Sequence, residues 1–247
     1  AGTGSEATKF TVITDAETDV KMLLKGEALL PDLAVVDYTN TLSSPKSITA
    51  STGLDALTHA VEAYTSKQAQ PLTDALALSA VKRIFKYLPA AYDDGNDEEA
   101  RYEMSIAALE AGICINNSSV TIVHGMSRPI GALFHVPHGL SNAMLLCKCM
   151  DFAKDGATDR FANLSRAVGT ATDADSDGLA ADKFIDGLLD ICRKCRVPTI
   201  SDYGIDVDKF INSIPKMTSD ALASGSPANT RKDVNAYDIA LIYQALV

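Results

Sequence analysis

The chain has 247 residues, of which 47% are apolar, and a formal net charge of −10. That composition is ample for a sizeable core, and the acidic balance argues against nucleic acid and anionic membranes as partners. No apolar run reaches the roughly 20 residues that a membrane-spanning helix needs.

The chain opens with short apolar segments separated by polar turns. Its first residues, AGTGSEATKF, lack the basic and apolar regions of a signal peptide, so we expect none here. KFTVITD, VKMLL and LAVVDY are rich in β-branched residues and are predicted to be strands. PDLAVVD has the clearest strand pattern of the three.

From residue 47 onward the pattern changes to long stretches with a 3.6-residue period. The predicted helices span about 52–66, 72–91, 97–115, 138–153, 157–168, 178–196, 207–214 and 234–246. The sequence therefore predicts a mainly α protein, with a β-containing lead-in at 1–46 and an all-helical domain at 47–247.

Five cysteines, an odd number, cannot all pair within one chain, which favours a reducing, cytoplasmic location. Two pairs of them, a CxC and a CxxC, lie inside predicted helices without the Gly or Pro turns of a zinc knuckle. We interpret them as buried or idle thiols.

Three of the four histidines lie in one stretch, HGMSRPIGALFHVPH, as His124, His135 and His138. The fourth, His59, follows Asp55 by four residues in a strong helical pattern, so the two share a helix face. Such a pair can bind one metal ion or can form a simple hydrogen bond.

The stretch between the clustered histidines contains Gly125, Pro129, Gly131 and Pro137. We expect a loop there that folds back and presents two imidazoles to one point, and spacing alone does not say whether His135 replaces one of its neighbours. Three imidazoles and one carboxylate suit Fe²⁺ or Zn²⁺, and Mn²⁺ less well. A closed site would be structural and an open one catalytic.

The Gly-, Ser- and Thr-rich start, AGTGSEAT, precedes a predicted strand. Its N–H groups and hydroxyls could contact a phosphate or a ribose. It is not a complete phosphate-binding motif, and a plain turn explains it as well.

Four motifs together resemble one family. GTGSEAT, GLDALTHAVEAY, HGMSRPIGALFHVPHGLSNAMLL and ALASGSPANTRKDVNAYDIALIY are similar, in order and spacing, to the iron-containing (group III) alcohol dehydrogenases, and the resemblance runs along the whole chain. It implies a dehydroquinate synthase-like helical C-terminal domain. The lead-in strands would then belong to an N-terminal α/β nucleotide-binding domain that this chain largely lacks.

The resemblance also implies roles for individual residues. The metal ligands would be Asp55, His59, His124 and His138, which selects His138 over His135. Thr3 and Lys21 would contact the nicotinamide cofactor. In many members a second histidine follows the first loop ligand by four residues, but Arg128 stands there in this sequence. His135 could take over its role in proton transfer.

The function implied is reversible hydride transfer between a small alcohol, diol or aldehyde and NAD(P), with Fe²⁺ or Zn²⁺ activating the substrate oxygen. A homodimer is expected from the family. The chain by itself is expected to turn over weakly or not at all. The alternative is a metal-binding helical domain with a hydrolytic or structural role.

Overall fold

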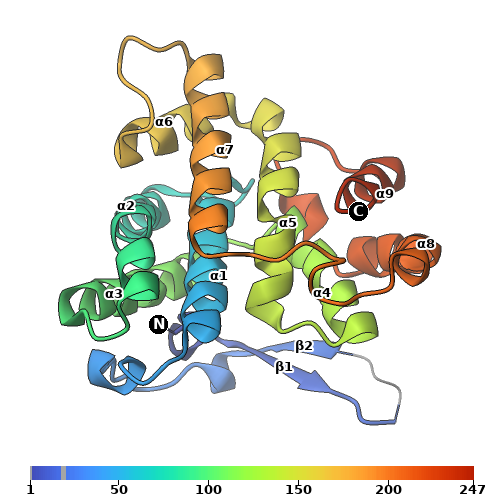
Figure 1. Cartoon of the computed structure of the whole chain (residues 1–247), viewed down its shortest axis with the longest axis horizontal. Helices are drawn as coiled ribbons and strands as arrows, with labels where there is room; N and C mark the ends of the chain where they lie inside the picture. The colour runs from blue at the N-terminus through green and yellow to red at the C-terminus, as the bar shows by residue number, and fades with distance from the viewer. Residues whose placement is uncertain (1, 18–20) are drawn as a thin grey trace.

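Helix α1 (Lys46–Thr65) runs through the middle of the molecule (Figure 1). Every residue from 49 to 65 except Thr52 is buried, which marks a core helix rather than a surface one. It packs against α2 (Pro71–Asp93), α3 (Glu98–Asn117) and α5 (His138–Ala153). Polar residues on α1 are therefore enclosed by the core.

The remaining helices complete the body around this centre in the computed structural model, which describes residues 2–17 and 21–247. Helix α4 packs against α5 and α8, α8 packs against α9, and α6 packs against α7. These elements are α4 (Ile122–Phe134), α6 (Thr158–Val168), α7 (Asp177–Lys194), α8 (Val207–Ala223) and α9 (Ala236–Gln244).

The only sheet among the described residues has two strands, β1 (Phe10–Thr14) and β2 (Lys21–Lys25). They pair antiparallel, with Phe10 opposite Lys25. The mainly α class predicted from the sequence is confirmed. The domain boundary at residue 46 stays a prediction, although α1 begins at Lys46.

The third predicted strand, LAVVDY, is absent from the described residues. Residues 31–37 form no strand and have no ladder partner, and Leu33 and Val35 are 79% and 78% exposed. The prediction was wrong because β-branched composition supplies a strand's shape but not the neighbouring strand that must accept its hydrogen bonds.

The loop expected between His124 and His138 is largely a helix, α4, with Pro129 inside it. Likewise, α8 continues past Pro215 to Ala223, beyond the predicted end at 214. A proline inside a helix costs one backbone hydrogen bond. Burial of Ile130 in α4, and of Met217 in α8, offsets that cost. The prediction that these two prolines end or interrupt a helix was therefore wrong.

Within residues 2–17 and 21–247, no single helix is long and apolar enough to cross a membrane, although α3 and α4 would pass that test together across a 103° bend. All five cysteines are free thiols, and four of them are buried.

Candidate metal centre

The structure brings together the four side chains that the sequence singled out as ligands. One ligand atom each from Asp55, His59, His124 and His138 lies within 4.8 Å of all the others. The Asp55 Oδ1 atom is 4.0 Å from His59 Nε2, 3.6 Å from His124 Nε2 and 3.8 Å from His138 Nε2. All three imidazoles thus face one carboxylate oxygen.

Three helices supply these residues. Asp55 and His59 lie one turn apart on α1, His124 is in the first turn of α4, and His138 is the first residue of α5. The start of α5 lies directly on α1, since a Cβ on Gly139 would come within 2.4 Å of the Ser51 carbonyl oxygen. A residue without a side chain there lets the two helices meet.

Hydrogen bonds to the far nitrogen orient two of the imidazoles. His59 Nδ1 lies 3.1 Å from the carbonyl oxygen of Thr3, and His124 Nδ1 lies 2.5 Å from Glu62 Oε2. Each partner accepts a hydrogen bond from the Nδ1–H group, so each ring, when neutral, keeps its lone pair on Nε2, which faces the cluster. This is the arrangement that metal-binding histidines require.

Thr3 reaches His59 because the chain's start packs backbone to backbone on α3. Gly4 has a φ of +79°, and a Cβ on it would lie 2.0 Å from the Ala108 carbonyl oxygen. A Cβ on Gly112 would lie 2.0 Å from the carbonyl oxygen of Gly4. Two glycines therefore allow a close approach that no other residue type permits.

Sequence reasoning missed two further residues of this cluster. Glu62, fully buried on α1, accepts hydrogen bonds from Thr121 Oγ1 and the Val123 N–H, both at 2.7 Å. Its signal was present, since an acid three residues after His59 interrupts an apolar run and shares the face of Asp55 and His59.

The second missed residue is Asn142, one turn after His138 on α5. Its Nδ2 donates to Asp55 Oδ1 at 2.5 Å and lies 3.1 Å from His124 Nε2. The Asn142 amide therefore orients the Asp55 carboxylate by this hydrogen bond. Helical spacing from His138 was the available signal, but an Asn in a helix is usually unremarkable.

Charges in the cluster are strongly coupled. Burial disfavours a charged Asp55, but the imidazoles around it outweigh burial and lower its pKa. Burial also opposes protonation of His124, yet Glu62 and Asp55 on either side raise its pKa to about 9. The pKa values of His59 and His138 are lowered, chiefly by desolvation, and that of His138 falls to about 4. Both rings are neutral at pH 7, as ligands must be.

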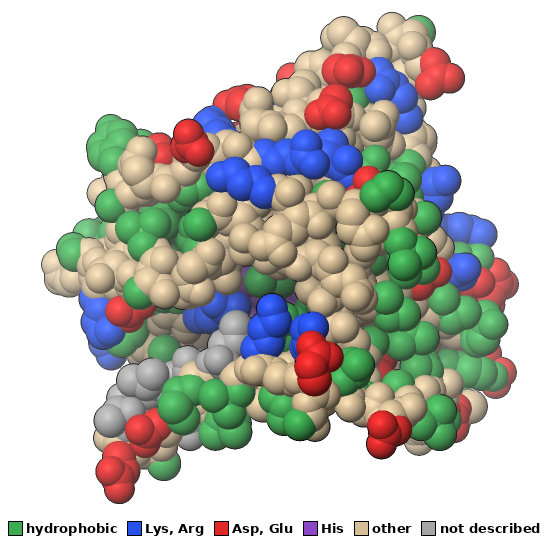
Figure 2. All heavy atoms as spheres, turned by 180° about the vertical axis from the view of Figure 1, so that it is seen from behind, with side chains coloured by type: hydrophobic (Ala, Val, Ile, Leu, Met, Phe, Trp, Pro, Cys, Tyr) green, Lys and Arg blue, Asp and Glu red, His purple; other side chains and the backbone are tan. Residues whose placement is uncertain are grey.

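The cluster opens to solvent on one side only. The side chain of His138 is 48% exposed, whereas those of Asp55, His59 and His124 are 8% exposed or less. Figure 2 shows histidine side chains at the floor of a recess, with Lys and Arg side chains beside it. A small molecule could therefore approach from the His138 side.

The donor set fits a divalent transition metal. Asp55 Oδ2 is buried without a hydrogen-bond partner among the described residues, a costly arrangement for a carboxylate unless a cation compensates it. Three imidazole nitrogens and one carboxylate oxygen suit Fe²⁺ or Zn²⁺. Asp55, His59, His124 and His138 would hold such an ion, and a further ligand could reach it past the half-exposed His138.

The other predicted site residues lie elsewhere or are described only in part. His135 ends α4 with a φ of 54° and is exposed outside the cluster. The Lys21 backbone begins β2, but its side chain lies outside the described part of the structure. Cofactor contacts by Thr3 and Lys21, and a proton-transfer role for His135, stay predictions.

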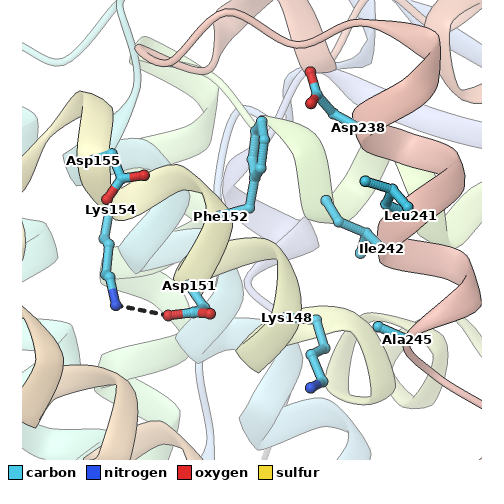
Figure 3. Close-up of a pocket in the computed structure, with 9 residues that line it drawn as sticks. All are labelled: Lys148, Asp151, Phe152, Lys154, Asp155, Asp238, Leu241, Ile242 and Ala245. Atoms are coloured by element: carbon cyan, nitrogen blue, oxygen red, sulfur yellow. Dashed lines mark hydrogen bonds and ion pairs between the residues drawn. The ribbon is translucent and has the colours of Figure 1, made fainter.

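A separate surface pocket of about 520 Å³ lies between α5 and α9 (Figure 3). None of its lining residues belongs to the cluster. Lys154, one of the lining residues, forms ion pairs with Asp151, as Figure 3 shows, and with Asp182. That lysine is therefore already paired to carboxylates, while Lys148 also lines the pocket.

The fold and the cluster define a helical domain that carries a candidate metal centre of three histidines and one aspartate. Residues 49–247 match the family model described as Fe-containing alcohol dehydrogenase family, C-terminal. The chain belongs to this family.

Individual relatives agree with that assignment. The 1,3-propanediol dehydrogenase of Klebsiella pneumoniae is 35% identical over 99% of this chain and 62% of its own length. The NADPH-dependent butanol dehydrogenase of Clostridium saccharobutylicum is 32% identical over 100% of this chain and 63% of its own. A crystal structure of 1,3-propanediol oxidoreductase superposes with a TM-score of 0.95 at 34% identity, covering all of this chain and 64% of that one. The chain thus spans less than two thirds of the length of these relatives.

Proposed function

We propose that the protein is an iron-dependent alcohol dehydrogenase that transfers hydride reversibly between a small alcohol or diol and NAD(P). The observation that carries the proposal is the enclosed cluster of Asp55, His59, His124 and His138, with two imidazoles held in the ligating tautomer. Family membership supports iron as the metal, and the same donors suit Zn²⁺. The names of the butanol and propanediol relatives support an alcohol substrate and a nicotinamide cofactor.

When bound, the divalent ion supplies Lewis acidity that lowers the pKa of a substrate hydroxyl group. The residues of this chain do the rest of the positioning. The carboxylate of Asp55 offsets the charge of the ion, and Glu62 and the Thr3 carbonyl fix the directions of His124 and His59. The core buries Asp55, His59 and His124, so a substrate would enter beside the half-exposed His138.

The proposal concerns the whole protein. Cytoplasmic location and a homodimer stay predictions. A hydrolytic or structural metal domain remains the competing function, and it differs in needing no nicotinamide.

Elemental analysis of the purified protein beside His138→Ala and Asp55→Ala tests the metal centre. We expect about one iron per chain in the wild type and a loss of at least tenfold in metal affinity in either variant. His135→Ala is the matched control, since it removes an imidazole outside the cluster. Metal retained in both cluster variants, or lost in His135→Ala, would contradict the assignment.

The reaction itself is tested on the full-length protein by following NAD(P)H formation with a panel of short alcohols and diols. Activity should depend on iron and should fall with His138→Ala but not with His135→Ala. Ester or phosphate cleavage without nicotinamide would favour the hydrolytic alternative.

A further inference from the structure

Arg128 is a cation beside the metal centre that lacks an acidic partner. It follows His124 by four residues on α4, so the two side chains leave the same helix face about one turn apart. Its Nη1 donates to Ser226 Oγ at 3.1 Å. Among the described residues, no carboxylate oxygen lies within the 4.0 Å of its guanidinium that would make an ion pair.

Other enclosed arginines in this chain are better satisfied. Arg160 is bonded to Asp74 at 2.5 Å and to the Tyr64 carbonyl oxygen. Arg101 donates to three separate oxygen atoms. Arg128 has five N–H donors and one acceptor among the described residues, and burial lowers its pKa. A partly buried cation left so incompletely paired is costly, and a ligand can repay that cost.

Arg128 stands one helical turn beyond the ligand His124 on α4, on the same helix face. Its charge is felt by His138, the exposed ligand, and by the buried Glu62. Basic side chains also gather beside the recess in which the histidines appear (Figure 2). A molecule that reaches the metal past His138 therefore comes close to Arg128.

The formal charges of the centre indicate the charge of a ligand that would pair with Arg128. Asp55 and Glu62 together carry −2, which a divalent ion neutralises when the three histidine ligands are neutral. Arg128 then adds +1 that no side chain of the cluster balances. The loaded site should attract one further negative charge on its solvent side.

We propose that Arg128 binds an anionic group carried by the substrate, so that the enzyme acts on an alcohol or aldehyde bearing a carboxylate or a similar oxyanion. The planar guanidinium fork matches such a group in two parallel hydrogen bonds. This inference rests on the proposed function, because it requires the substrate to sit at the metal centre.

The test compares two ligands of similar size, 3-hydroxypropionate and 1,3-propanediol, on protein loaded with Co²⁺ as a spectroscopic probe. Dissociation constants are read from changes in the visible absorption of the cobalt. The variants are Arg128→Met, which removes the charge, and Arg128→Lys, which keeps it. Arg193→Met is the matched control, since Arg193 is a 78% exposed surface residue.

Wild type and Arg193→Met should bind the carboxylate at least tenfold more tightly than the diol. Arg128→Met should reduce that preference by about 10- to 100-fold, the usual effect of losing hydrogen bonds to a charged group. Arg128→Lys should keep part of it. An unchanged preference in Arg128→Met would overturn the proposal, because the carboxylate would then be recognised by the metal alone.

Two further measurements distinguish a cofactor-binding role of Arg128 and a failure of the metal centre from the proposal. A titration with inorganic pyrophosphate tests whether Arg128 serves the cofactor instead. If Arg128→Met weakens pyrophosphate binding and leaves the carboxylate preference intact, the substrate assignment is wrong. If wild-type protein takes up no cobalt, the metal centre itself fails, and the inference about Arg128 falls with it.

Discussion

The carboxylate of Glu62 accepts a 2.5 Å hydrogen bond from Nδ1 of His124, across 62 residues of sequence. The same carboxylate accepts from the backbone N–H groups of Val123 and His124 at 2.7 and 3.4 Å. Helix α4 has no side-chain cap of its own, since Thr121 at its N-cap makes no such bond. Glu62 thus caps a helix to which it does not belong and orients the ligand in its first turn.

Glu62→Gln should weaken metal binding by about 10- to 100-fold. The amide can donate to Nδ1, which favours the His124 tautomer with the proton on Nε2, and that nitrogen cannot then bind a metal. A competition titration against a chelator measures the affinity. Glu110→Gln is the matched control, because this half-buried acid bonds Ser79 and Arg83 away from the cluster. Equal affinities for both variants would show that Glu62 has no such role.

Gly112→Ala should destabilise the protein by about 1–3 kcal/mol. The added methyl would lie 2.0 Å from the Gly4 carbonyl oxygen, so the chain's start must move off α3 and the Thr3 carbonyl leaves His59. Urea unfolding monitored by circular dichroism gives the free-energy difference.

Gly178→Ala serves as the control for that substitution, since nothing lies within 4 Å of a Cβ built there in the first turn of α7. It should be neutral or slightly stabilising, as expected for Gly→Ala in a helix. Similar losses in the two variants would mean that the Gly4–Gly112 contact carries no special weight.

Arg101→Met should cost about 3 kcal/mol or more. Arg101 is 1% exposed and donates to Thr49 Oγ1 and to the carbonyl oxygens of Gly95 and Ser44. Its removal leaves the buried Thr49 hydroxyl and two part-buried carbonyl oxygens without this donor, which carries a desolvation penalty. The midpoint of chemical unfolding checks the loss. Arg193→Met should change stability by less than about 0.5 kcal/mol, and a comparable loss there would point to a general effect of charge.

Asp175 should make stability depend on pH at its end of α7. A hydrogen bond from Lys183, and another from the Thr172 N–H, lower its pKa to about 2 from an ordinary 3.8. Because the folded pKa is the lower one, its contribution is present above about pH 4 and is lost as pH falls toward 2. The stability difference between wild type and Asp175→Asn should shrink over that window.

Unfolding curves recorded between pH 2 and 7 measure this difference. Asp173→Asn removes a charge from the same loop at an exposed position and is the control for the loss of charge itself. A difference between wild type and Asp175→Asn that stays constant with pH would refute the assigned ion pair.

The ligand pairing on α1 was predictable because it is local. Asp55 and His59 are four residues apart, and helix geometry alone places them on one face. The family resemblance then supplied His124 and His138. Their convergence depends on how α4 and α5 cross α1, which no local pattern encodes.

Glu62, Asn142 and helix α4 show where sequence reasoning ends. Glu62 has its role only because the start of α4 arrives beside it from 60 residues away. Helix α4 forms although its glycines and proline have low helix propensity, because the packing of its buried face outweighs that propensity. Residues 31–37 show the opposite case, since this segment has a strong strand propensity but no neighbouring strand to pair with.

Because His138 is the only exposed ligand, the rate at which a metal ion binds and the affinity with which it is held depend on different residues. Three of the four ligands are walled in by the core, so an ion must enter and leave past the one imidazole that solvent reaches. We therefore expect the exposed imidazole of His138 to govern how fast an ion is exchanged. The enclosed trio instead sets the equilibrium.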